Sequence, residues 1–325
     1  MTHRPKSVCA AVVQAASVLF DREACVEKAC RLVAEAATGG AQLVVFPEAF
    51  IPAYPRGLSF GTVIGRRSEP GRRTWLRYWE NAVDVPGPVT ERLGAAAREA
   101  NALLTIGVIE REGTFGRGTL YCTLLTFGPD GSLLGKHRKL KPTAAERTIW
   151  GEGDGSTLTV VETAYGRVGG LLCWENYMPL ARMALYAKGV EIYLAPTADD
   201  RNTWQATLRH IACEGRCFVI GCNQFVTKSM YPADLEGIED LADQPEVVCR
   251  GGSAIVSPMG QVIAGPLYGE EGILRAELGL AEVGASKFDF DVVGHYARPD
   301  VFQLTVNETP MPSVSTCRED AEPQC

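Results

Sequence analysis

Three polar residues of this chain lie at or just beyond the ends of expected strands. Pro47 and Glu48 come after the apolar run Leu43–Phe46, Cys173 ends the apolar run 169–173, and Lys139 is expected to follow a further strand. Open α/β sheets bind their ligands in the crevice beyond the strand ends. We therefore expect a carboxylate, an ammonium group and a thiol at one edge of the fold.

These groups are the parts needed to add water across a carbon–nitrogen bond. A thiolate is a strong nucleophile, and a base or a positive neighbour helps to form it. The addition places negative charge on nitrogen or oxygen, which Lys139 and the backbone N–H of Trp174 could stabilise. Glu48 would then move protons, and Glu146, seven residues after Lys139, is a candidate second carboxylate.

Each residue also has a simpler explanation. A cysteine at a strand end is usually a core residue, a lysine in a basic run such as 136–141 is usually solvated, and a glutamate after a strand is usually a surface residue or a helix cap. Their spacing in the sequence does not establish that they meet in space.

A metal site is the other chemistry to consider. His210, Cys213 and Cys217 could share one face of a helix. The sequence has no CxxC pair and no second ligand cluster to complete such a site. We therefore expect these cysteines to be small buried apolar residues, and we expect no metal and no cofactor.

The composition is that of an ordinary globular protein of 325 residues, with 46% hydrophobic and 22% charged residues. The net charge of −7 and the lack of a basic stripe argue against nucleic acid as a partner. The N-terminus does not resemble a signal peptide, and no apolar run is long enough to span a bilayer. The eleven cysteines form no regular framework, which indicates free thiols and a cytoplasmic location without membrane association.

Strands alternate with helices along the chain, which predicts an α/β fold in a single domain of two stacked layers of β-α-β units. Helices are expected at Asp21–Ala37, Pro88–Ala100, Pro179–Lys188 and Trp204–Gly215, and strands at Ala10–Gln14, Leu43–Phe46, Leu103–Ile109, Leu120–Phe127, Val168–Cys173, Val190–Ala195, Cys217–Cys222, Gly251–Ser257, Val262–Ala264 and Ile273–Leu278.

Two segments interrupt this alternation. Residues 52–81 are long and rich in aromatic side chains, and we expect a lid or specificity loop. The catalytic domain is expected to span residues 1–310, and residues 311–325 to form a short mobile tail.

Three motifs resemble the signatures of the nitrilase superfamily of carbon–nitrogen hydrolases. They are Phe46–Phe50, His137–Thr143 and Leu171–Glu175, and they come in the order of that family and at similar separations. Finer features resemble its nitrilase branch: the stretch Glu146–Gly155, the triplet Cys173-Trp174-Glu175 and the late motif Gly294–Asp300.

The resemblance implies a four-layer α-β-β-α sandwich, with Cys173 as nucleophile, Glu48 as general base and acid, Lys139 as the group that stabilises developing charge, and Glu146 as a positioning carboxylate. His295 matches a motif histidine, for which we expect a structural role. The resemblance also implies that subunits pair across helices near the nucleophile, as a homodimer that assembles further. Because the tail is short, we leave filament formation open.

The expected reaction is hydrolysis of a nitrile to a carboxylic acid and ammonia, through a covalent thioimidate and acyl-enzyme. The alternatives are an amidase or carbamoylase, hydration of the nitrile to the amide, or a cysteine-rich metal-binding or redox scaffold. The loop Tyr54–Trp79 and the stretch Thr197–Trp204 are expected to line the pocket, with Tyr54, Trp174, Thr197 and Trp204 as candidate residues. Their aromatic content would suit an aromatic or arylaliphatic nitrile, and would equally suit a lid core or a subunit interface.

Overall fold

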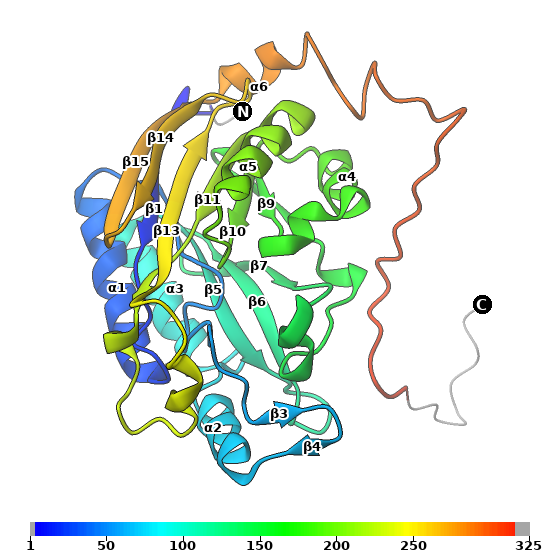
Figure 1. Ribbon diagram of the computed structural model, residues 1–325. Coiled ribbons are helices and arrows are strands. Elements are labelled where there is room, and N and C mark those ends of the chain that lie inside the picture. The colour runs from blue at the N-terminus through cyan, green and yellow to red at the C-terminus, as the bar shows by residue number, and fades with distance from the viewer. Residues whose placement is uncertain (1–3, 316–325) are drawn as a thin grey trace.

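The structure is a computed structural model that describes residues 4–315. Two β-sheets lie face to face at the centre, and helices cover the outer face of each sheet (Figure 1). The layers follow the order helix, sheet, sheet, helix within one domain. The predicted α/β class and α-β-β-α sandwich are confirmed.

The first sheet has the strand order β15-β1-β2-β5-β6-β7. Its strands are β1 (Ser7–Gln14), β2 (Leu43–Val45), β5 (Leu103–Arg111), β6 (Leu120–Phe127), β7 (Leu133–Arg138) and β15 (Gly272–Gly279). Strands β1, β2 and β5 are parallel, so each connection between them needs a crossover. Helices α1 (Arg22–Thr38) and α3 (Pro88–Ala100) lie in these connections.

The second sheet has the order β12-β13-β11-β10-β9-β8, and β14 pairs with β13. Its strands are β8 (Val160–Thr163), β9 (Gly166–Gly170), β10 (Ile192–Pro196), β11 (Phe218–Cys222), β12 (Phe225–Thr227), β13 (Val247–Val256) and β14 (Val262–Tyr268). Strands β9, β10 and β11 are parallel and are connected through α4 (Pro179–Ala187) and α5 (Asn202–Gly215).

The alternation of side chains along the central strands separates the layers of the core. Val44 of β2 packs with Val26 of α1 and Leu93 of α3 on the outer face of the first sheet. Its neighbours Leu43 and Val45 face the second sheet instead, in a cluster that contains residues of β9, β10 and β11. Both faces of these central strands are therefore buried, which explains why they are continuous apolar runs.

The helix ends follow local sequence signals. The Asp21 side chain accepts a hydrogen bond from the Ala24 N–H at the start of α1, and α3 begins with Pro88. Asn101 ends α3 in the left-handed conformation that suits this residue type.

Residues 52–81 differ from the loop that we expected. They contain the two-stranded hairpin β3 (Thr62–Val63) and β4 (Arg66–Arg67), followed by the helix α2 (Glu69–Glu80). Ser68 caps α2 with a hydrogen bond to the Gly71 N–H, and Tyr78 buries its ring against Phe20 and Phe60. The other short elements are η1 (Ala144–Thr148), η2 (Gly155–Thr157), η3 (Cys173–Tyr177), η4 (Lys228–Met230), η5 (Ile238–Leu241) and α6 (Ala281–Ser286).

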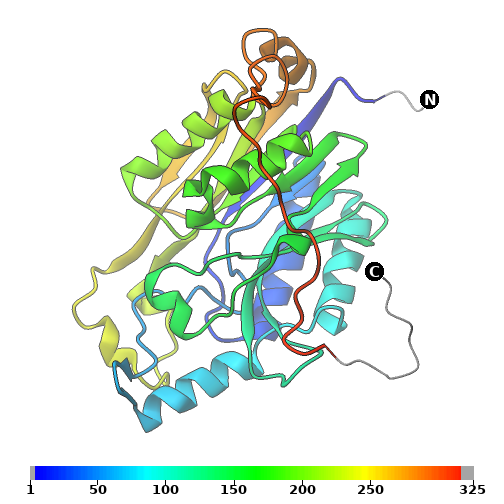
Figure 2. The same ribbon diagram turned by 90° about the vertical axis from the view of Figure 1, so that its right-hand side faces the viewer.

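After α6 the described chain continues along the outside of the molecule without helix or strand (Figures 1 and 2). Glu308 forms an ion pair with Lys188 at 2.8 Å, and the Met311 N–H donates to Asp154 Oδ2 at 2.7 Å. Residues 316–325 of the predicted tail lie outside the described residues, and the domain boundary at residue 310 stays a prediction.

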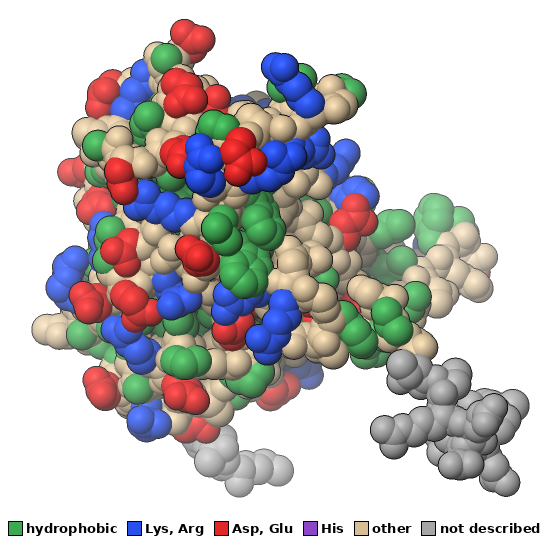
Figure 3. Space-filling view, turned by 90° about the horizontal axis from the view of Figure 1, so that it is seen from below, with side chains coloured by type: hydrophobic (Ala, Val, Ile, Leu, Met, Phe, Trp, Pro, Cys, Tyr) green, Lys and Arg blue, Asp and Glu red, His purple; other side chains and the backbone are tan. Residues whose placement is uncertain are grey.

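On the face shown in Figure 3, Lys and Arg side chains are interspersed with Asp and Glu side chains. Between residues 4 and 315, no helix is both long and apolar enough to cross a membrane.

Candidate active site

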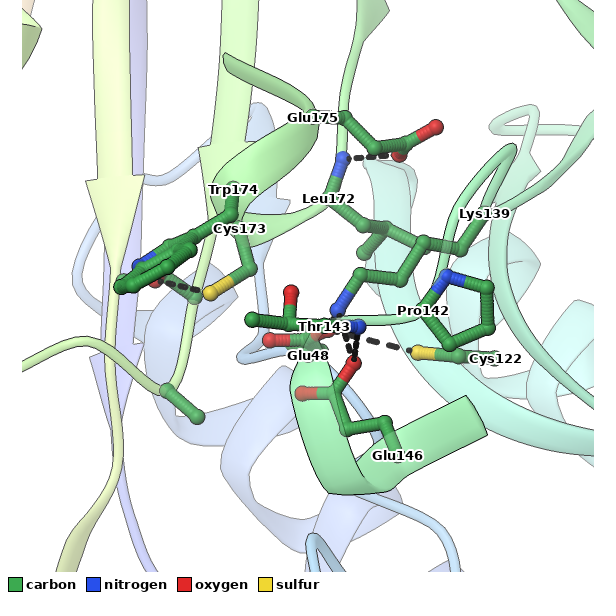
Figure 4. Close-up of polar contacts among 12 residues, drawn as sticks. Glu48, Cys122, Lys139, Pro142, Thr143, Glu146, Leu172, Cys173, Trp174 and Glu175 are labelled. Atoms are coloured by element: carbon green, nitrogen blue, oxygen red, sulfur yellow. Dashed lines mark hydrogen bonds and ion pairs between the residues drawn. The ribbon is translucent and has the colours of Figure 1, made fainter. Parts of the chain in front are cut away.

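Lys139 lies between two carboxylates in the interior of the protein. Its Nζ donates to Glu48 Oε1 at 2.6 Å and to Glu146 Oε2 at 2.8 Å (Figure 4). The side chains of Lys139 and Glu48 are fully shielded from solvent, and that of Glu146 nearly so. Charges that are this close and this poorly solvated interact strongly. The sequence-predicted carboxylates and the lysine therefore form one ionic cluster.

Glu48 is positioned by a turn that lies against β5. After β2 the chain crosses over Gly107, whose N–H donates to Pro47 O at 3.1 Å and whose carbonyl accepts from Phe50 N at 2.8 Å. A β-carbon on Gly107 would lie 2.4 Å from Pro47 O and 2.7 Å from Glu48 Cα. This close approach requires glycine, and it fixes the backbone of the turn that presents Glu48.

Glu146 comes from η1, which follows the Lys139 strand end. Its Oε2 also accepts from the Thr143 N–H at 2.6 Å, which caps the turn. Its Oε1 accepts from the Tyr54 hydroxyl at 2.6 Å. Both carboxylate oxygens of Glu146 are thus engaged, which suits a group that positions Lys139 and Tyr54.

Cys173 comes from the second sheet. Strand β9 ends at Gly170, earlier than we expected, and Cys173 begins the turn η3 with a φ of 50°. A residue with a β-carbon rarely adopts this left-handed conformation, and such strain is typical of functional positions. The Asn176 side chain holds the turn, because its Nδ2 donates to the carbonyls of Leu171 at 2.9 Å and Cys173 at 2.8 Å.

The thiol of Cys173 is neutral at rest. Burial, and next the charge of Glu48, raise its pKa to about 12, although Lys139 acts in the opposite direction. The Thr197 hydroxyl donates to Sγ at 3.1 Å. A nucleophilic role for Cys173 would therefore require a base that removes the thiol proton.

Glu48 has the properties of that base. Burial raises its pKa, against the attraction of Lys139 and with the repulsion of Glu146. Burial by itself lowers the pKa of Lys139, but the negative charge of Glu48 outweighs this effect and raises the pKa well above its usual value, so Lys139 is the cation. Among the described residues, Glu48 Oε2 has no hydrogen-bond partner, whereas Oε1 accepts from Lys139 and from the Cys122 thiol at 3.5 Å. Oε2 is thus the oxygen that is available for proton transfer.

A cavity of about 460 Å³ opens onto this site, which is ample for a small organic substrate. Its wall is formed by residues 54–62, by η1 and the residues beside it, by Cys173 and Trp174, and by residues 198–201. Both segments that we expected to line the pocket contribute to this wall.

The candidate pocket residues have different positions. Tyr54 and Trp174 line the cavity. Thr197 is buried directly behind the Cys173 thiol. Trp204 lies in the core around α5, packed against Tyr177 at 6.0 Å, and is outside the set of described residues that line the cavity.

The family model for carbon–nitrogen hydrolases matches residues 9–288. The chain belongs to the carbon–nitrogen hydrolase family. It lies in the nitrilase branch, because it is 55% identical to an aliphatic nitrilase of Sinorhizobium fredii, over 94% of this chain and 98% of that protein. It is also 54% identical to a bifunctional nitrilase/nitrile hydratase of Lupinus angustifolius (94% and 87%), and 53% identical to a nitrilase of Bradyrhizobium diazoefficiens (97% of both).

Solved structures of carbon–nitrogen hydrolases share the fold. The NitFhit protein of C. elegans matches with a TM-score of 0.72 and 20% identity, over 96% of this chain and 70% of that one. A carbon–nitrogen hydrolase of Helicobacter pylori matches with a TM-score of 0.70 and 20% identity, over 92% and 98%.

Some residues of this hydrolase were not identified from the sequence. Cys122 contacts Glu48, but it is in mid-strand, where a cysteine is usually a core residue. Arg56 lines the cavity and donates to Ala198 O, and its pKa is raised despite burial, by Cys249 and Asp200. An arginine in a long loop gives no signal of such a position.

The remaining sequence candidates lie elsewhere. His295 is exposed and packs against Tyr296 at 5.2 Å. His210 lies 3.5 Å from Glu214, Cys213 is exposed and Cys217 is buried. No group of metal-ligating side chains is found in the described part of the chain.

Proposed function

We propose that this enzyme hydrolyses an organic nitrile to the carboxylic acid and ammonia, with Cys173 as the nucleophile. The observation that carries the proposal is that the Cys173 thiol lies on the wall of a substrate-sized cavity, within electrostatic reach of the Glu48–Lys139–Glu146 cluster. The nitrilases to which this chain is more than 50% identical over nearly its whole length support the choice of substrate.

The first half-reaction forms a thioimidate. Glu48 Oε2 accepts the proton of Cys173 as the sulfur attacks the nitrile carbon, and then delivers this proton to the nitrile nitrogen as the carbon–nitrogen triple bond becomes a double bond. Lys139 and the Trp174 N–H stabilise the charge that develops. Glu146 holds Lys139 and Tyr54 in place.

The second half-reaction uses two waters. Glu48 accepts a proton from the first water as it adds to the thioimidate carbon, and passes it to the nitrogen, which becomes an amino group. Glu48 then moves the hydroxyl proton of this tetrahedral intermediate to the amino group, which leaves as ammonia and leaves a thioester. The second water adds to the resulting thioester in the same way, and the carbon–sulfur bond breaks to release the acid and regenerate the thiol. The sum is one nitrile and two waters to one acid and one ammonia.

The proposal is tested by product analysis. Purified enzyme is incubated with aliphatic, aromatic and arylacetonitrile substrates and with the matching amides, and acid, amide and ammonia are measured. We expect acid and ammonia in equal amounts from at least one nitrile, and no turnover by Cys173→Ala. The exposed Cys213→Ala serves as the matched control and should be fully active. Turnover of amides alone, or an active Cys173→Ala, would reject the proposal.

Partial release of amide is a second candidate outcome. Several relatives at 52–54% identity are named as bifunctional nitrilase/nitrile hydratases. Amide leaves if the first tetrahedral intermediate expels Cys173 sulfur before nitrogen. The ratio of amide to acid in the same assay measures this branch, and an amidase or carbamoylase is not favoured by these relatives.

We also propose a homo-oligomer in the cytoplasm. Trp174, Tyr177, Met178 and Leu180 form an apolar patch at the η3–α4 junction, each of them more than a third exposed. Exposed patches of this kind usually mark interfaces. The nine cysteines within the described residues are free thiols, which suits a reducing compartment.

A further inference from the structure

A second buried ionic group lies behind the catalytic cluster and takes no part in the steps above. It consists of Glu175 in η3 and His137 in β7. His137 Nε2 lies 3.0 Å from Glu175 Oε2, and the two side chains are 4% and 0% exposed. Burying ionisable groups in this way is costly, so the pair needs a physical reason.

The two oxygens of Glu175 hold backbone groups from the two sheets. Oε1 accepts from the Leu140 N–H at 2.6 Å. Oε2 accepts from the Leu172 N–H at 2.8 Å, as Figure 4 shows. Leu140 directly follows Lys139, and Leu172 directly precedes Cys173. One carboxylate therefore joins the strand end that presents the cation to the turn that presents the thiol.

The contacts of His137 indicate which of its ring nitrogens carry protons. Its Nδ1 lies 2.9 Å from the Thr157 carbonyl oxygen, which can only accept, so Nδ1 carries a proton. A neutral ring would then direct the lone pair of Nε2 at a carboxylate. Both oxygens of Glu175 already accept from backbone N–H groups, as a carboxylate does, so the proton between Oε2 and Nε2 is assigned to Nε2, which makes His137 a cation.

The surroundings of His137 agree with this assignment. Burial lowers its pKa, but Glu175 outweighs that effect, so the pKa is raised above its usual value. Its neighbours in β7, Lys136 and Arg138, are ion-paired with Glu110 of β5. From β10, Tyr193 is kept neutral by burial, which raises its pKa. Glu175 is thus the charged group that faces the ring.

We infer that Glu175 is a positioning residue of the active site, whose carboxylate, held by protonated His137, sets the separation of Lys139 and Cys173 across the two sheets. The inference rests on the proposed function for its kinetic effect. The structural tie itself does not depend on which substrate is turned over.

The main test is Glu175→Gln. An amide places an NH2 donor where one of the two carboxylate oxygens lies, so one of the two N–H groups loses its acceptor. We expect kcat to fall by about 10²-fold, because small misplacements of reacting groups have effects of this size, with little change in KM. Hydrogen exchange should become faster in the peptides that contain Leu140 and Leu172. Unchanged kcat together with unchanged exchange would overturn the inference.

Glu110→Gln is the matched control. Glu110 is an equally buried glutamate that holds Lys136 and Arg138 on the same strand as His137, but it has no contact with Leu140 or Leu172. We expect it to lower the thermal stability and to leave kcat and the two exchange rates close to the wild-type values. If both variants lose kcat equally, Glu175 only stabilises the fold and does not position the active site.

His137 provides the second arm of the test. Glutamine at this position can still donate to Glu175, whereas leucine cannot, so kcat should fall in the order wild type, His137→Gln, His137→Leu. In ¹⁵N NMR spectra of the wild type, both ring nitrogens of His137 should be protonated at pH 7. A neutral ring would overturn the assignment.

A readout without nitrile separates this inference from the proposed function. The rate at which iodoacetamide alkylates Cys173 is measured by mass spectrometry. It should change at least several-fold in Glu175→Gln and little in Glu110→Gln. If no nitrile is hydrolysed, the proposed function fails, and alkylation and exchange still decide the role of Glu175.

Discussion

Glu48 and Glu146 share one ammonium group, so the cluster around Lys139 carries an excess negative charge when all three are ionised. Burial and the repulsion of Glu146 raise the pKa of Glu48, and this makes it a stronger base near neutral pH. In the proposed mechanism Glu48 accepts the Cys173 proton, and it is also the carboxylate whose ionised form is disfavoured by burial.

Glu48→Gln should separate activity from stability. We expect activity to fall by about 10²–10⁴-fold, the usual contribution of general acid–base catalysis. Because the pKa of Glu48 is raised by folding, its carboxylate destabilises the folded state progressively as the pH rises from 4.5 through the raised pKa. We therefore compare the difference in unfolding temperature, variant minus wild type, at two pH values. This difference should be more positive at pH 8 than at pH 5. A variant that loses stability most at pH 8 would contradict this charge assignment.

Lys139→Ala should have the opposite effect on stability. It removes the cation that the two carboxylates share and leaves both buried without a counter-charge. Breaking a buried ion pair from one side typically costs about 3–5 kcal/mol in the free energy of unfolding. Urea denaturation at pH 7 measures this loss. A stability equal to that of Glu48→Gln would show that the cluster is better solvated than the structure indicates.

At the scale of the elements, β5 supports the Glu48 turn through Gly107. Gly107→Ala would place a β-carbon within 2.4–2.7 Å of three backbone atoms, so the turn must move. We expect a loss of about 1–3 kcal/mol in stability, typical of overpacking, and a kcat lowered by about 10²-fold. Gly113→Ala is the control, because a β-carbon there has no atom within 4 Å. Denaturation and steady-state kinetics of both variants test the difference.

The elements that the sequence did not reveal are those with weak apolar patterns. An apolar strand was expected before Lys139, but its range was not: β7 has only Leu133 and Leu134, both more than a third exposed, and continues with polar residues. Helix α2 is rich in arginine and buries little besides Tyr78. The strongly apolar β2 and the helices α1 and α3 were predicted within one or two residues, because both faces of β2 and one face of each helix are buried.

On the scale of the whole molecule, the site lies where the two sheets meet. The first sheet supplies Glu48 and Lys139, and the second supplies Cys173 and Thr197. The sequence motifs led us to expect that Glu48, Lys139 and Cys173 lie close together. Spacing could not predict that Glu48 and Glu146 share Lys139, or that Glu175 ties the sheets together, because these contacts depend on how one sheet packs on the other.

The apolar patch at the η3–α4 junction connects this site to the outer surface. Trp174 lines the cavity, and its ring contacts Tyr177 of the patch at 5.8 Å, so a partner on the patch would support the cavity wall. Leu180→Glu places a charge on the most exposed member of the patch. We expect a smaller assembly by light scattering and reduced activity, because the charge must lose its water to enter an interface. Val262→Glu, on an exposed part of β14, should retain the wild-type mass and activity; a Leu180→Glu variant of unchanged mass would place the interface elsewhere.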